Sequence, residues 1–236
     1  MHRRARHLNA RDAGATMVLD ARFISGSDGD AIGTWSSRTS STYNMTQATT
    51  ANKPLLKLGS NGLNGQATVL FDGTNDYMDG ANESIDTCSF FCAVNNTNSL
   101  TYKNIFGRSS QTYIRNIIVL TETASNKLVV NRSDGSTSKT AATTDFTAGA
   151  RIVNAYYDGT NLGIRIDGKS YSTQTGVSST GGRSWNLGYL YDGPSASYYW
   201  DSKMSSVILF KNSVASSSMA KRVEHSLGYS FKIACS

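Results

Sequence analysis

The alternation of hydrophobic and polar residues typical of short antiparallel strands is clearest between residues 152 and 171. Residues 152–157 are β-branched and aromatic, which suits a half-buried strand. Apolar and polar residues then alternate over residues 162–167, so this second strand should have one buried face and one solvent-exposed face. Asp-Gly dipeptides at 158–159 and 167–168 supply tight turns on both sides of it. The pattern predicts a β-meander.

Other apolar runs predict further strands along the chain. They are Thr16–Phe23, Ala67–Phe71, Cys88–Val94, Asn104–Arg108, Tyr113–Leu120, Lys127–Asn131, Arg183–Tyr189 and Tyr198–Phe210. In the last run, the alternation from Met204 places Ile208 on the same face and Val207 on the opposite face. The sequence Asp-Gly-Thr-Asn occurs at 72–75 and again at 158–161, which indicates the same turn chemistry at both places rather than a duplicated domain.

One helix is predicted, over residues 216–227. Ser216 or Ser217 can cap its first turn, and Met219, Val223 and Leu227 form an apolar stripe with helical spacing. Gly228 follows as a stop signal. We expect this helix to close an edge or end of an all-β sandwich.

Length and composition fit one such domain. A chain of 236 residues can bury a large core, and aromatic residues make up 10% of it. In a strand, Cys88 and Cys92 lie about 13 Å apart, beyond the roughly 7 Å that a disulfide allows. We interpret both as core thiols, with a metal or redox role as the alternative. No run of about 18 apolar residues is present, so no membrane span is expected.

Residues 1–15 form a basic N-terminal arm that should anchor the chain to a partner. Four arginines and one aspartate give it a net charge of +3, half of the formal charge of +6 for the whole chain. The remaining body lacks the clustered cations of a nucleic-acid-binding surface, so nucleic acid is not an expected partner of the body. The alternative is a solvated tail. The arginines are Arg3, Arg4, Arg6 and Arg11.

Several motifs resemble the concanavalin A-like, laminin-G-like jelly-roll domains of bacterial and phage surface proteins. They are Asp28–Trp35, Thr46–Thr49, Gly62–Gly65 and Val69–Tyr77, followed by the meander and by Trp200–Asn212 with the final helix. The resemblance extends from about Thr16 to Phe231 and implies a two-sheet antiparallel jelly-roll sandwich over residues 16–236. Because one fold hosts many functions, it implies little about activity.

Some members of this family bind calcium through carboxylates in their loops. The family usually has an aspartate two residues after the tryptophan, where this chain has Ser37. Asp20, Asp72 and Asp76 remain as oxygen ligands for Ca²⁺. The alternative is that Asp72 and Asp76 hydrogen-bond to the backbone of their own turn. No other cofactor is expected.

Catalysis is not expected. Glucanases that share this jelly roll use three carboxylates at alternating positions of one strand, and glycoside hydrolysis needs a positioned pair. The chain has three glutamates, and no two of them are neighbours in the sequence. Its histidines lie in the arm and in the predicted helix, without a nucleophile motif around them.

An aromatic stretch near the C-terminus suggests a shallow glycan site instead. Trp185 and Trp200 fall in strand patterns and should belong to the core. The expected site residues are Tyr189, Tyr191, Asp192 and Tyr198, around the Gly193-Pro194 turn. Aromatic faces stack on sugar C–H surfaces while polar side chains hold the hydroxyls.

The expected function is that of a non-enzymatic structural protein of a phage virion. The family works mostly outside cells, yet the chain shows neither an apolar signal segment nor a disulfide plan, and a virion protein released by lysis reconciles these features. The module would act on a capsid or tail as decoration or adhesion, with other virion proteins, itself or cell-surface glycans as partners. The alternatives are an extracellular lectin-like module on a bacterial surface and an intracellular scaffold.

Overall fold

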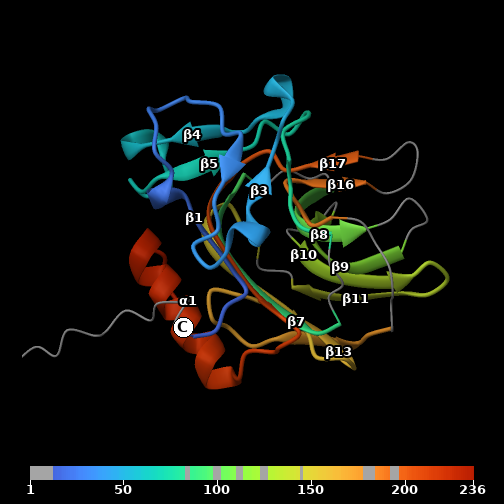
Figure 1. The fold of residues 1–236 in the computed structure, drawn as a ribbon. Helices are drawn as coiled ribbons and strands as arrows, with labels where there is room; N and C mark the ends of the chain where they lie inside the picture. The colour runs from blue at the N-terminus through green and yellow to red at the C-terminus, as the bar shows by residue number, and fades with distance from the viewer. Residues whose placement is uncertain are drawn as a thin grey trace, which may run out of the picture.

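The computed structural model describes residues 13–82, 86–97, 102–109, 114–122, 127–143, 146–177, 184–191 and 197–236. Within these ranges the chain forms two antiparallel sheets of eight strands each, a two-stranded ribbon and one helix (Figure 1). The all-β jelly-roll sandwich predicted from the sequence is confirmed. No helix of the described part is both long and apolar enough to cross a bilayer.

The first sheet contains the predicted meander at one edge. Its order is β14-β13-β12-β7-β18-β5-β4, with β1 also paired to β18. Its strands are β1 (Met17–Asp20), β4 (Leu55–Lys57), β5 (Thr68–Leu70), β7 (Cys88–Asn96), β12 (Gly149–Tyr157), β13 (Asn161–Ile166), β14 (Ser172–Thr175) and β18 (Lys203–Lys211).

The second sheet has the order β11-β10-β9-β8-β15-β6-β3-β2. Its strands are β2 (Thr34–Trp35), β3 (Met45–Thr46), β6 (Met78–Asp79), β8 (Lys103–Ser109), β9 (Ile114–Glu122), β10 (Lys127–Asp134), β11 (Ser138–Thr143) and β15 (Asn186–Leu187). The ribbon, β16 (Tyr189–Tyr191) with β17 (Ser197–Tyr199), follows β15 in the chain and lies beside β8 (Figure 1). Short 3-10 turns, among them η1 (Ala21–Phe23), connect the N-terminal strands.

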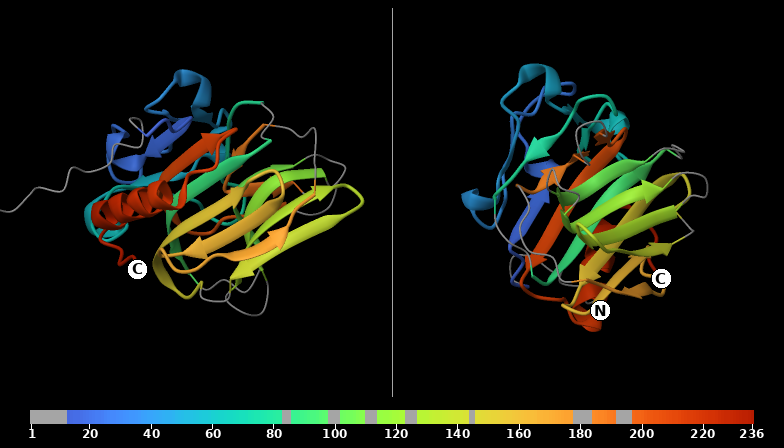
Figure 2. Two further views of the ribbon diagram at one scale, coloured as in Figure 1. Left: turned by 90° about the horizontal axis from the view of Figure 1, so that it is seen from below. Right: turned by 90° about the vertical axis from the view of Figure 1, so that its right-hand side faces the viewer.

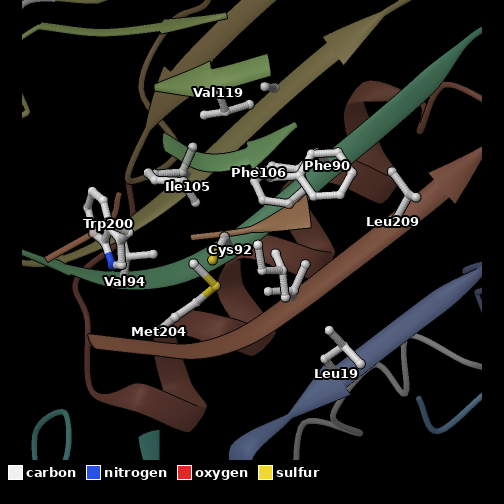
Figure 3. Packing of buried hydrophobic residues seen from close by; sticks show 14 of the residues in the cluster. Leu19, Phe90, Cys92, Val94, Ile105, Phe106, Val119, Trp200, Met204 and Leu209 are labelled. Carbon is white, nitrogen blue, oxygen red and sulfur yellow. The ribbon is translucent and has the colours of Figure 1, made fainter. Parts of the chain in front are cut away.

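The main core lies between the two sheets. Phe90 of β7 stacks on Phe106 of β8 with ring centroids 4.6 Å apart, which joins the sheets directly (Figure 3). Cys88 and Cys92 are fully buried free thiols, as predicted. Burial raises the pKa of Cys88 to about 12 and that of Cys92 well above its usual value.

The turn prediction for the repeated Asp-Gly-Thr-Asn sequence is also confirmed. The carboxylate of Asp72 accepts hydrogen bonds from the backbone N–H groups of residues 74 and 75, and Asp158 accepts from those of residues 160 and 161. The glycine that follows each aspartate has a positive φ, 75° at Gly73 and 99° at Gly159. Side-chain capping and a glycine in this conformation are the local determinants of such turns.

Helix α1 (Ser217–Phe231) covers the outer face of the first sheet rather than an edge or end of the sandwich (Figure 2). It forms a second hydrophobic cluster with strands β1, β7, β12 and β18, which explains why β7 is apolar on both faces. The buried residues of this cluster include Val18, Phe91, Ile152, Ile208, Phe210, Val223, Leu227 and Phe231.

The prediction that one face of β13 is exposed to solvent is also wrong. Arg165 is only 5% exposed, because its guanidinium forms an ion pair with Glu224 of α1. Gly163 is covered by the ring of Tyr156, and a methyl group at this glycine would lie 2.1 Å from a ring carbon. The helix therefore covers Arg165 through an ion pair, and the neighbouring strand β12 covers Gly163 through the ring of Tyr156, although the alternation alone assigns both residues to solvent.

The parity predicted for the last strand is also wrong. Met204 pairs with Val94 and Ser206 with Ala93, so β18 has one extra residue here, a β-bulge. The bulge shifts the alternation by one residue, and Met204 therefore shares the inner face with Val207. Ile208 and Phe210 face the helix instead.

The helix continues past the predicted stop. Ser216 caps its N-terminus, as expected, by accepting a hydrogen bond from the N–H of Met219. Gly228 is inside the helix, where a methyl group would lie 2.7 Å from the carbonyl oxygen of Ile233. The helix ends at Lys232, which has a φ of +54°. Gly228 thus serves close packing rather than termination.

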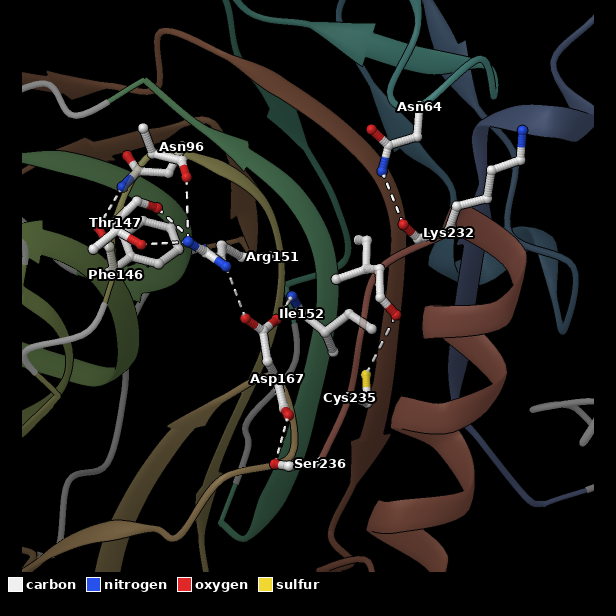
Figure 4. Close-up of polar contacts among 12 residues, drawn as sticks. Asn64, Asn96, Phe146, Thr147, Arg151, Ile152, Asp167, Lys232, Cys235 and Ser236 are labelled. Atoms are coloured by element: carbon white, nitrogen blue, oxygen red, sulfur yellow. Dashed lines mark hydrogen bonds and ion pairs between the residues drawn. The ribbon is translucent and has the colours of Figure 1, made fainter.

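The C-terminal residues return to the meander. The N–H of Ser236 donates a hydrogen bond of 2.9 Å to the carbonyl oxygen of Asp167, in the turn after β13 (Figure 4). The Asp167 carboxylate accepts from the N–H of Ile152 at 2.8 Å and pairs with Arg151 at 3.2 Å. Burial nonetheless raises the pKa of Asp167, although both contacts oppose the shift. These contacts of Asp167 fix the chain after α1.

Candidate functional site

The ribbon β16–β17 determines where the predicted aromatic residues lie. Trp185 and Trp200, which precede and follow the ribbon in the chain, are buried in the main core, as predicted. Tyr189 pairs with Tyr199 across the ribbon, and Leu190 pairs with Tyr198. Directly paired residues of antiparallel strands share a face, and neighbours in one strand point to opposite faces. The ribbon therefore separates Tyr189 from Tyr198.

One face of the ribbon carries a row of three partly exposed tyrosine rings, here called the tyrosine row. The rings of Tyr189 and Tyr199 have centroids 5.0 Å apart, and those of Tyr77 and Tyr189 have centroids 5.3 Å apart. Tyr77 comes from the segment before β6, which pairs with β15 next to the ribbon. The row thus combines β16, β17 and a segment from the first half of the chain.

The row has a rigid support. The peptide N–H of Trp200 donates to the carbonyl oxygen of Gly188 at 2.8 Å. Gly188 has a φ of +78° and lies against the ring of Phe71, where a methyl group would clash at 2.4 Å. The amide of Asn104 donates a hydrogen bond of 2.7 Å to the carbonyl oxygen of Tyr189. These contacts fix the backbone of both ribbon strands where Tyr189 and Tyr199 begin and end the ribbon.

Tyr198, a predicted site residue, lies on the opposite face of the ribbon. Leu190 and Val129 are buried together there, and Tyr198 packs on them. Its ring is also 5.4 Å from that of Tyr102, which is 39% exposed. Tyr191 lies in β16 opposite Ser197, and neither its side chain nor Asp192 is among the described parts of the chain.

Charged side chains are present in the segments that carry the row. Lys103 of β8 pairs with Asp201, two residues after Tyr199, at 3.6 Å. The turn that precedes Tyr77 contacts Asp201 at Gly73, where a methyl group would lie 2.4 Å from the aspartate Cβ. The ion pair and the turn at Gly73 therefore connect β8, the end of β17 and the segment that carries Tyr77.

The predicted calcium ligands do not come together as a set of three. Asp20 caps η1 and forms an ion pair of 2.7 Å with Arg22. Asp76 accepts a hydrogen bond from the N–H of Asp72, so these two carboxylates lie close together. Burial and the neighbouring charge of Asp72 raise the pKa of Asp76 to about 6. Among the described residues, no group of three or more histidine, cysteine, aspartate or glutamate side chains could hold a metal ion.

The acidic residues of the described part offer no exposed glutamate pair for acid–base chemistry. Glu224 is 1% exposed and bonded to Arg165. Glu83 and the side chain of Glu122 lie outside the described residues, as do Arg3, Arg4, Arg6 and Arg11 of the predicted arm. At the end of that arm, Ala13 and Ala15 pack into the cluster under α1.

Comparison with known proteins supports the fold. The sequence matches no family model and no curated protein. Trypanosoma rangeli sialidase, solved with a difluoro-nononic acid, matches with a TM-score of 0.63 and 12% identity over 95% of this chain and 34% of that one. The binding domain of botulinum neurotoxin serotype D matches with a TM-score of 0.59 and 11% identity over 89% of this chain and 51% of that one. At these identities the likeness shows the fold alone.

A smaller structure is less similar. The Ruminococcus gnavus IT-sialidase CBM40, solved with α2,3-sialyllactose, matches with a TM-score of 0.49 and 12% identity over 58% of this chain and 82% of that one, too low to bear on function. The chain spans about half of the neurotoxin domain and a third of the T. rangeli sialidase. This chain is a β-sandwich of the type those proteins contain.

Proposed function

We propose that the protein is a non-enzymatic module that binds glycans through the tyrosine row. The observation that carries the proposal is the contact of the partly exposed rings of Tyr77, Tyr189 and Tyr199, with centroids 5.3 and 5.0 Å apart. A surface of adjacent aromatic faces suits the C–H faces of consecutive sugar rings. The fold is compatible with this proposal, because about a third of a sialidase that was solved with a sugar acid matches this chain.

The rigidity of the row supports binding rather than catalysis. A pre-formed site loses little conformational entropy when its ligand binds. Asn104 and Gly188 fix the backbone beneath Tyr189. The charged pair Lys103–Asp201 supplies polar groups for hydroxyls.

A glycan array with the full-length chain tests the proposal. A glycan that binds is then titrated against Tyr77→Ala, Tyr189→Ala and Tyr198→Ala. We expect the first two changes to weaken binding at least about tenfold, since a few residues, often tyrosines, supply most of the binding energy of an interface. Tyr198→Ala is the matched control on the opposite face of the ribbon, and its effect should be within about threefold.

Two outcomes would count against the proposal. An array with no bound glycan would refute it. Equal losses from Tyr189→Ala and Tyr198→Ala would show that the ribbon as a whole, rather than the tyrosine row, sets the affinity. Thermal unfolding of each variant separates lost binding from lost folding.

We further propose that the module is displayed on the surface of a phage virion, where residues 1–15 anchor it and the tyrosine row faces outward for adhesion. The net charge of +3 on residues 1–14 and the Ser-, Thr- and Asn-rich body support this setting. Deleting residues 1–12 should leave the fold intact and abolish incorporation into particles. Unchanged incorporation would favour the alternative, a lectin-like module on a bacterial surface.

A further inference from the structure

A groove with a volume of about 1040 Å³ lies between the C-terminal half of α1 and the outer face of β1 and β18, far from the tyrosine row in the fold. Val18, Ile208 and Leu227 line its apolar part. The remaining lining includes cationic, aromatic and hydroxyl side chains from four separate segments. A volume of this size accommodates an organic ligand of several rings rather than a single inorganic ion.

The groove has an excess of positive charge. Arg22 is neutralised by Asp20, to which it is bound in a bidentate manner at 2.9 and 2.7 Å. Arg38 and Lys232 also line the groove, and in the described ranges neither has a carboxylate partner. The Arg38 guanidinium stacks on the ring of Phe23, 3.6 Å from its centroid. This stacking holds a cation at the wall of the groove without neutralising it.

The rim also carries aromatic and polar groups. Tyr229 lines the groove with its side chain 73% exposed, and Phe23, 59% exposed, supports Arg38 beside it. These are two of the most exposed large hydrophobic side chains in the described part of the chain. The amide of Gln66 and the hydroxyl of Ser230 are further lining groups. An acyl chain could not form hydrogen bonds with these polar groups.

We propose that this groove is a second ligand site and that it takes an acidic saccharide, a sugar whose rings carry carboxylate or sulfate groups. Arg38 and Lys232 pair with the anionic substituents, Tyr229 stacks on a ring, and Gln66 and Ser230 bind hydroxyls. The site is independent of the tyrosine row, which shares no residue with it.

Calorimetric titration with tri-galacturonate at low ionic strength tests the proposal, with the neutral methyl ester of the same trisaccharide as the comparison. The acid should bind the full-length protein at least about tenfold more tightly than the ester. Arg38→Gln and Lys232→Gln should each weaken binding of the acid about tenfold, because each removes one charged hydrogen-bond donor. Lys221→Gln removes the same charge from an exposed position of α1 outside the groove and should have no more than a twofold effect.

The proposal fails if the acid and the ester bind equally, if neither binds, or if Lys221→Gln weakens binding as much as Arg38→Gln. Equal or tighter binding of a hexaglutamate peptide would overturn the saccharide class. Tyr189→Ala must leave the affinity for tri-galacturonate unchanged. A loss with this variant would place acidic sugars on the tyrosine row and refute the groove site, whereas the absence of array binding refutes only the row.

Discussion

The contact between Arg165 and Glu224 holds α1 on the sandwich, and removing one partner should be costly. The Nε and Nη2 atoms of Arg165 lie 2.8 and 2.7 Å from the two carboxylate oxygens of Glu224. The amide of Asn154 donates a third hydrogen bond of 3.0 Å to the same carboxylate. Because the two charged residues are 5% and 1% exposed, water cannot replace a missing partner without a rearrangement of the helix.

Glu224→Ala leaves the Arg165 guanidinium buried without its counter-charge, stacked only on the ring of Tyr171, 4.2 Å from the centroid. Breaking a buried pair in this way costs about 3–5 kcal/mol. Domains have a total unfolding free energy of about 5–15 kcal/mol, so the change removes at least about a fifth of it. The double variant Arg165→Met/Glu224→Leu removes both charges and should cost less than about 1 kcal/mol.

Urea unfolding followed by tryptophan fluorescence measures these free energies. We expect the wild type and the double variant to have similar free energies of unfolding, and Glu224→Ala to have a clearly lower one. A cost below about 1 kcal/mol for Glu224→Ala would show that α1 is held by its apolar residues alone. A double variant as unstable as Glu224→Ala would show that the side chains matter through packing rather than through charge.

Three further outcomes follow from the structure. The Asp76 carboxyl should titrate near pH 6 by NMR, above the usual value of about 3.9. The protonated carboxyl therefore stabilises the fold below about pH 4, and this contribution is lost as pH rises through about 6. Asp76→Asn should remove this part of the dependence of the unfolding free energy on pH. A titration midpoint near pH 4 for Asp76 would contradict the burial of this group. Cys88 and Cys92 should not react with a thiol reagent at pH 8 until the protein unfolds, since burial keeps them protonated, and fast labelling of the native state would contradict their core positions. Gly163→Ala should cost about 1–3 kcal/mol because the ring of Tyr156 occupies the space of the new methyl group, and the cost should shrink in a Tyr156→Ala background.

Local features of the fold could be predicted from the sequence. The meander and both Asp-Gly-Thr-Asn turns depend on residues within a few positions of one another, and they lie where the pattern places them. The buried thiols likewise follow from the spacing within one strand. Short-range turn chemistry and alternation are sufficient for such features.

The remaining features depend on residues that are distant in the chain. From the sequence we expect Arg165 to be exposed to solvent, but α1 covers it, and the alternation within β13 contains no information about this helix. A single extra residue in β18 reverses the parity of Val207 relative to Met204. Tyr77 joins the tyrosine row only because β6 pairs with β15, and its place directly after the turn at 72–76 is the one local signal that could have suggested it.

The most direct test of the central claim is an NMR titration of the full-length protein with a glycan identified on the array. We predict that the largest shifts fall on Tyr77, Tyr189 and Tyr199, with little change at Tyr198 and Tyr102 on the other face of the ribbon. Shifts centred on Tyr198 and Tyr102, or spread evenly over the molecule, would contradict it.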